Sequence, residues 1–126
     1  MDKIVQVIKS LSDKNRLRII AALMENKELC ACQITELLNI RGASVSRHLS
    51  QLVNAGILKS RKEGRWIYFS IRNRKMSDAL LSCIKAELLK SEEIERDRKV
   101  LKKILATDVE DICRKQRGEK CCPKKN

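Results

Sequence analysis

The segment from residue 30 to residue 71 constrains the fold most, because two helical patterns are followed there by two strand patterns. The first helix is predicted by apolar residues spaced i, i+3, i+4, which are Ile34, Leu37 and Leu38. A second helix over Ala43–Ala55 is predicted by apolar residues spaced i, i+4, i+7, which are Val45, Leu49 and Leu52. Two short helices separated by a few polar residues are typical of a helix-turn-helix.

The residues between and after these helices have turn chemistry. Asn39–Gly42 is expected to turn the chain, with Gly42 free to adopt a positive φ. Ser44 is the predicted N-cap of the second helix, and Gly56 stands where a C-terminal stop is expected.

The second helix has a polar face opposite its apolar stripe. At about 100° per residue from Val45, Arg47 lies near ~200° and Gln51 near ~240°. An arginine and a glutamine on one face suit a DNA major groove, where they bind guanine and adenine edges. His48 borders the stripe, where a hydrogen bond that orients the helix or a phosphate contact is expected. The predicted DNA-binding residues of this helix are Ser44, Ser46, Arg47, His48 and Gln51.

A basic β-hairpin is predicted after Gly56. Its strands are Ile57–Lys62 and Arg65–Ile71, joined by Glu63-Gly64 as a two-residue connection. The cations placed to contact phosphates beside the groove are Lys59, Arg61, Lys62 and Arg65. The only aromatic residues of the chain are Trp66, Tyr68 and Phe69. They could stack on single-stranded bases, but we expect them to pack the hairpin onto the helices.

The order of these segments resembles the ArsR/SmtB family of metal-responsive winged-helix repressors. The resemblance spans about residues 3–90 and is carried by LSDKNRLRIIAAL, ELCACQITELL, SVSRHLSQLVNAGIL and RKEGRWIYFSI. The CxC at the start of the first motif helix is most similar to the arsenite-responsive branch. The resemblance implies a mainly α fold with a small β-hairpin, a winged helix-turn-helix. It also implies a homodimeric repressor on an inverted-repeat DNA operator, released when As(III) or Sb(III) binds cysteine thiolates.

The flanking segments are predicted to be helical scaffold. Lys3–Ser10 and Asp13–Asn26 form the first two helices, and a longer helix begins near Met76 with an apolar stripe of Leu80, Leu81, Ile84 and Leu88. An exposed stripe of this kind usually meets a partner, and the resemblance makes this helix and the first one the dimer interface. Thr107 and Glu110 have capping-box spacing for a last helix near Asp108. We expect a winged-helix and dimerisation domain over 1–90 and a charged, cysteine-containing extension over 91–126.

The positive charge is concentrated on the motif. Residues 41–75 hold nine Lys and Arg against one acidic residue, a net +8, whereas residues 1–40 carry +1 and residues 76–126 carry +3. Such a footprint favours nucleic acid, and it lacks the apolar neighbour that a lipid surface would need. Because neither a membrane-spanning run nor a signal-peptide pattern is found, the sequence predicts a cytoplasmic protein without a membrane partner.

The six cysteines predict a sensing site. Cysteines at CxC spacing in a chain with one histidine favour a thiophilic ion, and a secreted disulfide scaffold does not fit a helical chain. Cys30 and Cys32 are the predicted ligands, but residues two apart on a helix diverge by about 200°, so they can converge only where the helix is just beginning. The helix N-terminus is expected to lower the pKa of these thiols. Coordination by both sulfurs would distort the start of the first motif helix, which sets the angle of the second, and operator affinity would fall.

The third sulfur is left open. Similar arsenite sites use three thiolates, and the position that would complete CxCxxC is Thr35. Cys121 and Cys122 are the predicted donors, with Cys113 a weaker candidate and an exogenous thiol as the remaining choice. Cys83 is expected to be a small buried hydrophobe.

Three alternatives remain. The repressor could respond to Cd(II), Pb(II) or Zn(II), or to oxidation of its thiols. A thiol oxidoreductase is the remote alternative, because the sequence lacks a CxxC on a strand-to-helix turn and any phosphate or oxyanion cradle. We therefore expect a regulator and not an enzyme.

Overall fold

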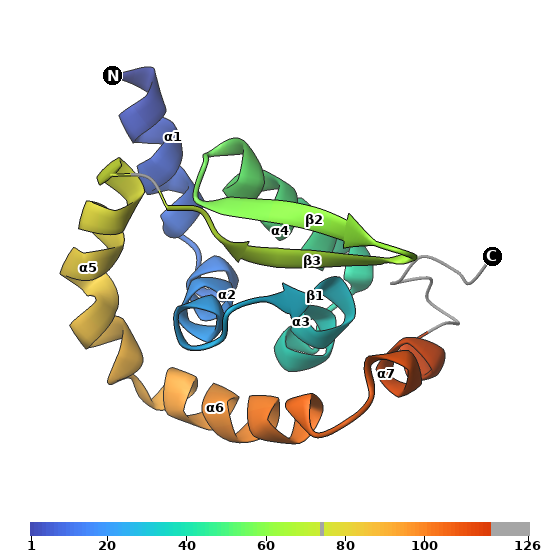
Figure 1. Ribbon diagram of the computed structural model, residues 1–126. Coiled ribbons are helices and arrows are strands. Elements are labelled where there is room, and N and C mark those ends of the chain that lie inside the picture. Colours follow the sequence, from blue (N-terminus) through green and yellow to red (C-terminus); the bar gives the residue numbers. More distant parts are fainter. Residues whose placement is uncertain (74, 117–126) are drawn as a thin grey trace.

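A small antiparallel sheet packs against a cluster of helices in the computed structural model of the chain, which describes residues 1–73 and 75–116 (Figure 1). In chain order the elements are α1 (Asp2–Leu11), α2 (Lys14–Glu25), β1 (Leu29–Cys30), α3 (Ala31–Leu38), α4 (Gly42–Asn54), β2 (Leu58–Glu63), β3 (Trp66–Ile71), α5 (Lys75–Leu89), α6 (Glu92–Leu105) and α7 (Val109–Gln116). The arrangement is a winged helix-turn-helix: α3 and α4 form the motif, and β2 and β3 form the wing.

The sheet has the strand order β1-β3-β2, with β3 in the middle. The predicted hairpin is present, but its turn was placed one residue too early. Glu63 pairs with Trp66, so the two connecting residues are Gly64 and Arg65, with Gly64 at φ +60°. The short strand β1 was not predicted. Its residues Leu29 and Cys30 pair with Phe69 and Tyr68, which ties the start of the helix-turn-helix to the wing.

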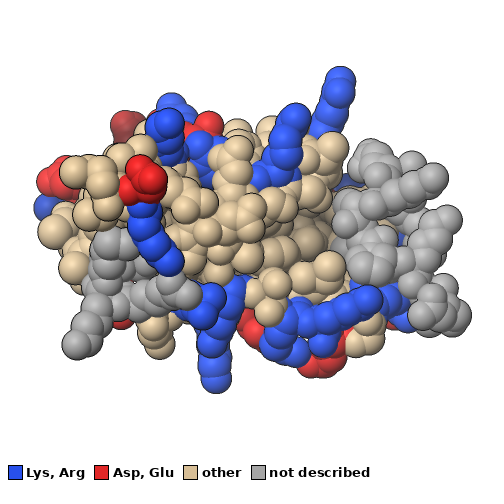
Figure 2. All heavy atoms as spheres, turned by 90° about the horizontal axis from the view of Figure 1, so that it is seen from above, with Lys and Arg blue, Asp and Glu red and all other residues tan. Residues whose placement is uncertain are grey.

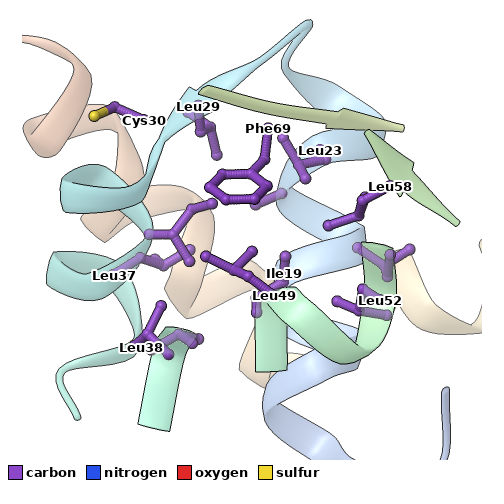
Figure 3. Close-up of a cluster of buried hydrophobic side chains, with 14 of the residues drawn as sticks. Ile19, Leu23, Leu29, Cys30, Leu37, Leu38, Leu49, Leu52, Leu58 and Phe69 are labelled. Carbon is purple, nitrogen blue, oxygen red and sulfur yellow. The ribbon is translucent and has the colours of Figure 1, made fainter. Parts of the chain in front are cut away.

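The hydrophobic core lies on one face of this sheet (Figure 3). Phe69 projects from β3 into the centre of the cluster, and Leu29 from β1 lies beside it. The helices contribute most of the other large side chains, among them Ile19, Leu23, Leu37, Leu49 and Leu52, and Leu58 is added by β2. Residues of α3 and α4 that were predicted from helical spacing are therefore the ones that pack under the sheet, and this packing fixes α4 relative to the wing.

The turn of the motif is built differently from the prediction. Asn39, not Gly42, holds the positive φ, at 54°, since a short polar side chain tolerates the left-handed region. Helix α4 begins at Gly42 with Arg41 as its N-cap, so Ser44 lies inside the first turn and the predicted cap was wrong. The predicted stop at Gly56 is confirmed, with φ 81°.

The C-terminal helices wrap around one side of the molecule (Figure 1). Helix α6 is joined to α2 by the ion pair of Arg18 with Asp97, 2.9 Å between nitrogen and oxygen. The last helix follows Asp108 as predicted, but Asp108 itself, not Thr107, accepts the Glu110 N–H at 3.3 Å. None of the described helices is long and apolar enough to cross a bilayer.

The predicted burial of Cys83 is wrong for the single chain, because its side chain is exposed on α5. Leu81 is the buried residue of this helix. A position two residues along a helix points about 200° away, so Cys83 faces outward.

Candidate functional site

The outward face of α4 presents a compact set of polar side chains. Ser46, Arg47 and Gln51 are exposed, as the helical spacing predicted, and Ser44 is half-buried. Val45, Leu49 and Leu52 on the opposite face are buried. Helix α4 is therefore anchored by its apolar stripe and leaves an arginine and a glutamine free to approach another molecule. Figure 2 shows Lys and Arg side chains projecting from the face of the molecule seen there, with fewer acidic ones.

His48 has a different environment from these residues. Arg16 of α2 donates from Nη1 to His48 Nδ1 at 3.2 Å, and Asp13 Oδ2 lies 3.9 Å from the same nitrogen. Arg16 also donates to the Ser10 carbonyl oxygen at 2.6 Å. His48 thus fastens α4 to the junction of α1 and α2, which matches the expected orienting hydrogen bond. Sequence patterns gave no signal for Arg16 as its partner.

The four wing cations fall into two groups. Lys59 and Lys62 are exposed. Arg61 is exposed as well, but it is paired: it donates to both carboxylate oxygens of Glu28, with 2.9 Å from Nε to Oε2, and its guanidinium lies 4.7 Å from the centre of the Tyr68 ring. This guanidinium lowers the pKa of the Glu28 carboxyl, chiefly by hydrogen bonding.

Arg65 is also engaged within the chain. It is half-buried, lies 3.3 Å from Glu110 of α7 and sits 4.4 Å above the Trp66 ring. A paired cation offers less net charge to a phosphate than a solvated one. The two lysines are therefore the wing residues best placed to meet a polyanion, while the two arginines depend on their acidic partners. Glu28 and Glu110 were not singled out by the sequence.

Cys30 lies where β1 passes into α3. Its backbone is extended and caps the helix, and its own N–H donates to Gln33 Oε1 at 2.8 Å. Its side chain is fully buried, with 0% exposed. Burial raises the pKa of the Cys30 thiol, and the nearby N–H groups of Cys32, Ile67 and Ala31 offset part of this effect. The predicted lowering of this pKa is wrong, because desolvation outweighs the helix N-terminus.

Cys32 is the second residue of α3 and is also 0% exposed. Because Cys30 is extended and Cys32 helical, the pair straddles the start of the helix, as convergence on one ion requires. Cys32 is disulfide-bonded in the structure, so its use as a ligand needs the reduced chain. Cys121 and Cys122 lie outside the described residues. Within 1–73 and 75–116, no three Cys, His, Asp or Glu side chains are grouped to hold a metal ion.

Cys113 of α7 lies closer to this region than the sequence indicated. It is 5% exposed, and the Trp66 indole N–H donates to its sulfur at 3.1 Å. The same helix reaches α3, because Gln116 Nε2 donates to the Cys32 carbonyl oxygen at 3.3 Å. A usable signal was present in the sequence: Val109, Ile112 and Cys113 share one helical face, which indicates packing.

The fold and the exposed face of α4 define a winged-helix transcriptional regulator, and comparison with known proteins agrees. The family model described as "Bacterial regulatory protein, arsR family" matches residues 13–60. A helix-turn-helix type transcriptional regulator of Methanocaldococcus jannaschii is 34% identical over 79 residues, 63% of this chain and 89% of that protein. The chain belongs to the ArsR family of transcriptional regulators, which is not a family of enzymes.

Two other relatives carry names that mention metals. The cadmium resistance transcriptional regulatory protein CadC of Listeria innocua is 41% identical over 54% of this chain and 57% of that protein. The arsenic resistance transcriptional regulator ArsR1 of Pseudomonas putida is 40% identical over 52% of this chain and 51% of that protein. The chain therefore spans little more than half the length of these two relatives.

Solved structures agree with the fold. HlyU from Vibrio cholerae superposes with a TM-score of 0.59 at 22% identity, covering 68% of this chain and 91% of that one. The transcriptional repressor PagR of Bacillus anthracis superposes with a TM-score of 0.56 at 26% identity, covering 66% and 93%. The mainly helical winged helix-turn-helix expected from the sequence is confirmed.

Proposed function

We propose that the chain is a repressor that binds operator DNA as a homodimer and dissociates from it when As(III) or Sb(III) binds its cysteine thiolates. The observation that carries the proposal is the pairing of Cys30 with Tyr68, which builds the first cysteine of the CxC into the sheet that supports the wing. A change at this sulfur would therefore reach β3, the middle strand of the sheet that carries the wing.

DNA binding is assigned to α4 and the wing. Ser44, Ser46, Arg47 and Gln51 face the major groove, with His48 holding the helix in place, and Lys59, Arg61, Lys62 and Arg65 lie beside the phosphates. The two copies of α4 read half-sites of an inverted repeat about 34 Å apart. The concentration of positive charge on residues 41–75 supports this assignment.

The homodimer is assigned to α1 and α5. An apolar groove of about 550 Å³ lies between α1, α2 and α5, lined by Ile8, Leu11, Leu17, Leu80, Ile84 and Leu88. Ile8 in this lining is 52% exposed, and Ile4 and Val5 on the same helix are 46% and 41% exposed. Apolar surface of this kind is costly for an isolated chain and is covered in a dimer.

The inducer site is assigned to Cys30 and Cys32. Two sulfurs are the donors that a soft ion prefers, and both lie at the strand-to-helix junction. Cys121 and Cys122 remain the proposed further donors. The named relatives divide between cadmium and arsenic resistance, so Cd(II) is the leading alternative ion, ahead of Pb(II) and Zn(II). The cytoplasm, where thiols stay reduced, is the proposed location.

A second candidate function is favoured by the disulfide at Cys32. In this version the repressor responds to oxidation of its thiols, and the disulfide form is the released form.

One titration separates these functions. The reduced full chain is bound to fluorescent duplex DNA from its own promoter, and anisotropy is followed while arsenite, antimonite, Cd²⁺, Pb²⁺, Zn²⁺ or hydrogen peroxide is added. We expect release by arsenite and antimonite. Release by peroxide alone would replace the metalloid repressor with a redox repressor, and binding that no addition weakens would overturn both.

A further inference from the structure

Helix α7 bridges the wing and α3 across the outer face of the sheet. On the wing side, Trp66 donates to Cys113 at 3.1 Å and Arg65 lies 3.3 Å from Glu110. On the α3 side, Glu36 accepts from Lys115 at 2.7 Å and from Gln116 at 2.8 Å. One short helix therefore contacts both parts of the molecule that must keep their relative position for DNA binding.

The sulfurs of Cys30 and Cys113 face the same side of the sheet. Cys30 lies opposite Tyr68 in the ladder, and side chains two residues apart on a strand share a face. Trp66 is therefore on the face of Cys30, and it is the hydrogen-bond partner of Cys113. Figure 3 agrees, because the Cys30 sulfur points away from the core cluster around Phe69.

We propose that Cys30 and Cys113 act as a pair of sulfur ligands, the seat, for a thiophilic ion. Helix α7 is the element through which binding of the ion affects the wing. The inference rests on the proposed function: it adds Cys113 to the sulfurs proposed there, Cys30 and Cys32, and it names the helix that moves. Both side chains are almost fully buried, at 0% and 5% exposed. A ligand pair in such a place is shielded from competing water and from adventitious thiols.

Binding of the ion to the two thiols is a ligand exchange that needs no oxidant. Arsenite, As(OH)₃, exchanges two As–O bonds for two As–S bonds, and two water molecules leave, each taking the proton of one thiol. A divalent cation such as Cd²⁺ would instead release the two protons to solvent. In both cases the Cys113 sulfur changes from acceptor of the Trp66 N–H to ligand.

Ion binding at Cys113 would change the contacts of the wing tip. The Trp66 ring lies under the Arg65 guanidinium, which also pairs with Glu110. A shift of Cys113 toward Cys30 therefore disturbs the two contacts that hold the tip of the wing to α7, Trp66 with Cys113 and Arg65 with Glu110. Since Trp66 is the only tryptophan of the chain, its fluorescence reports this site directly, without DNA.

The test follows Trp66 fluorescence in the reduced full chain, free of DNA, as arsenite or Cd²⁺ is added. Wild-type protein is compared with Cys113→Ser and with Cys83→Ser, which removes an exposed thiol on α5. We expect the fluorescence change to be retained in Cys83→Ser, and ion affinity to fall about tenfold or more in Cys113→Ser. Circular dichroism verifies folding, and Cys113→Ala, which keeps a small apolar side chain, replaces the serine variant if that variant unfolds.

The outcomes separate the two proposals. Wild-type affinity in the Cys113 variants would overturn the seat, while arsenite release of DNA by the same variants would leave the proposed function intact. If wild-type protein is not released from DNA by any ion, the proposed function fails regardless of Cys113. A response to Cd²⁺ but not to arsenite would keep the seat and change the inducer.

Discussion

Cys30 pairs with Tyr68 across the junction of β1 and β3, so the first cysteine of the CxC is part of the wing's own sheet. The two residues lie 38 positions apart in the sequence (68 − 30) and meet only through the fold. This pairing gives the cysteine site a short mechanical route to the wing, in addition to the route through α3 to α4.

The first prediction concerns base recognition by Arg47. Arg47→Ala should remove about 1–3 kcal/mol of discrimination between operator and unrelated DNA, because a bidentate contact to guanine is lost. Competition binding with operator and scrambled duplexes measures this. Lys62→Ala is the control: it should weaken both duplexes equally and reduce the salt slope by about one. If both variants lose specificity to the same extent, the division between α4 and the wing is wrong.

The second prediction concerns the ion pair of Glu28 with Arg61. Glu28→Gln removes one of the two carboxylates that pair with this guanidinium, the other being Glu63. Arg61 then becomes more available to phosphate, and DNA affinity should rise at low salt. Glu93→Gln on α6 removes an equal charge from the exposed ion pair of Glu93 with Lys14 of α2 and should change affinity less. Equal gains in the two variants would mean that only net charge matters.

The third prediction concerns the CxC pair. Cys30→Ser and Cys32→Ser should bind DNA as wild type does but should no longer be released by arsenite, because one ligand of the ion is missing. For the wild-type protein we expect arsenite binding to lower the affinity for DNA by about 5–150-fold. Anisotropy under reducing conditions measures both quantities, and circular dichroism verifies that each variant folds. Normal release from either variant would move the site elsewhere.

The fourth prediction concerns the apolar groove. Ile8→Glu places a charge on a residue that is 52% exposed in the single chain and would be buried in the dimer, so the variant should sediment as a monomer and bind operator more weakly. Leu105→Glu, at a residue 45% exposed on α6, is the matched control and should stay dimeric. A dimeric Ile8→Glu variant would exclude α1 from the interface.

Local patterns predicted most of the helix-turn-helix. The apolar spacing of Ile34, Leu37 and Leu38, and of Val45, Leu49 and Leu52, identified the buried faces, because a helix must turn one stripe toward the core. Gly56 was identified as the stop. The errors were local too: Asn39 rather than Gly42 adopts the left-handed conformation, and the hairpin turn lies one residue later.

The sequence by itself determined the periodicity of the elements, the exposed polar face of α4 and the excess of positive charge, because each depends on residues close together in the chain. Only the tertiary structure decided which of those charges are engaged and which thiols are neighbours. Glu28 reaches Arg61, and Cys113 reaches Trp66, across 33 and 47 positions. Such contacts arise from the packing of β1 and α7 against the wing, and no local pattern specifies them.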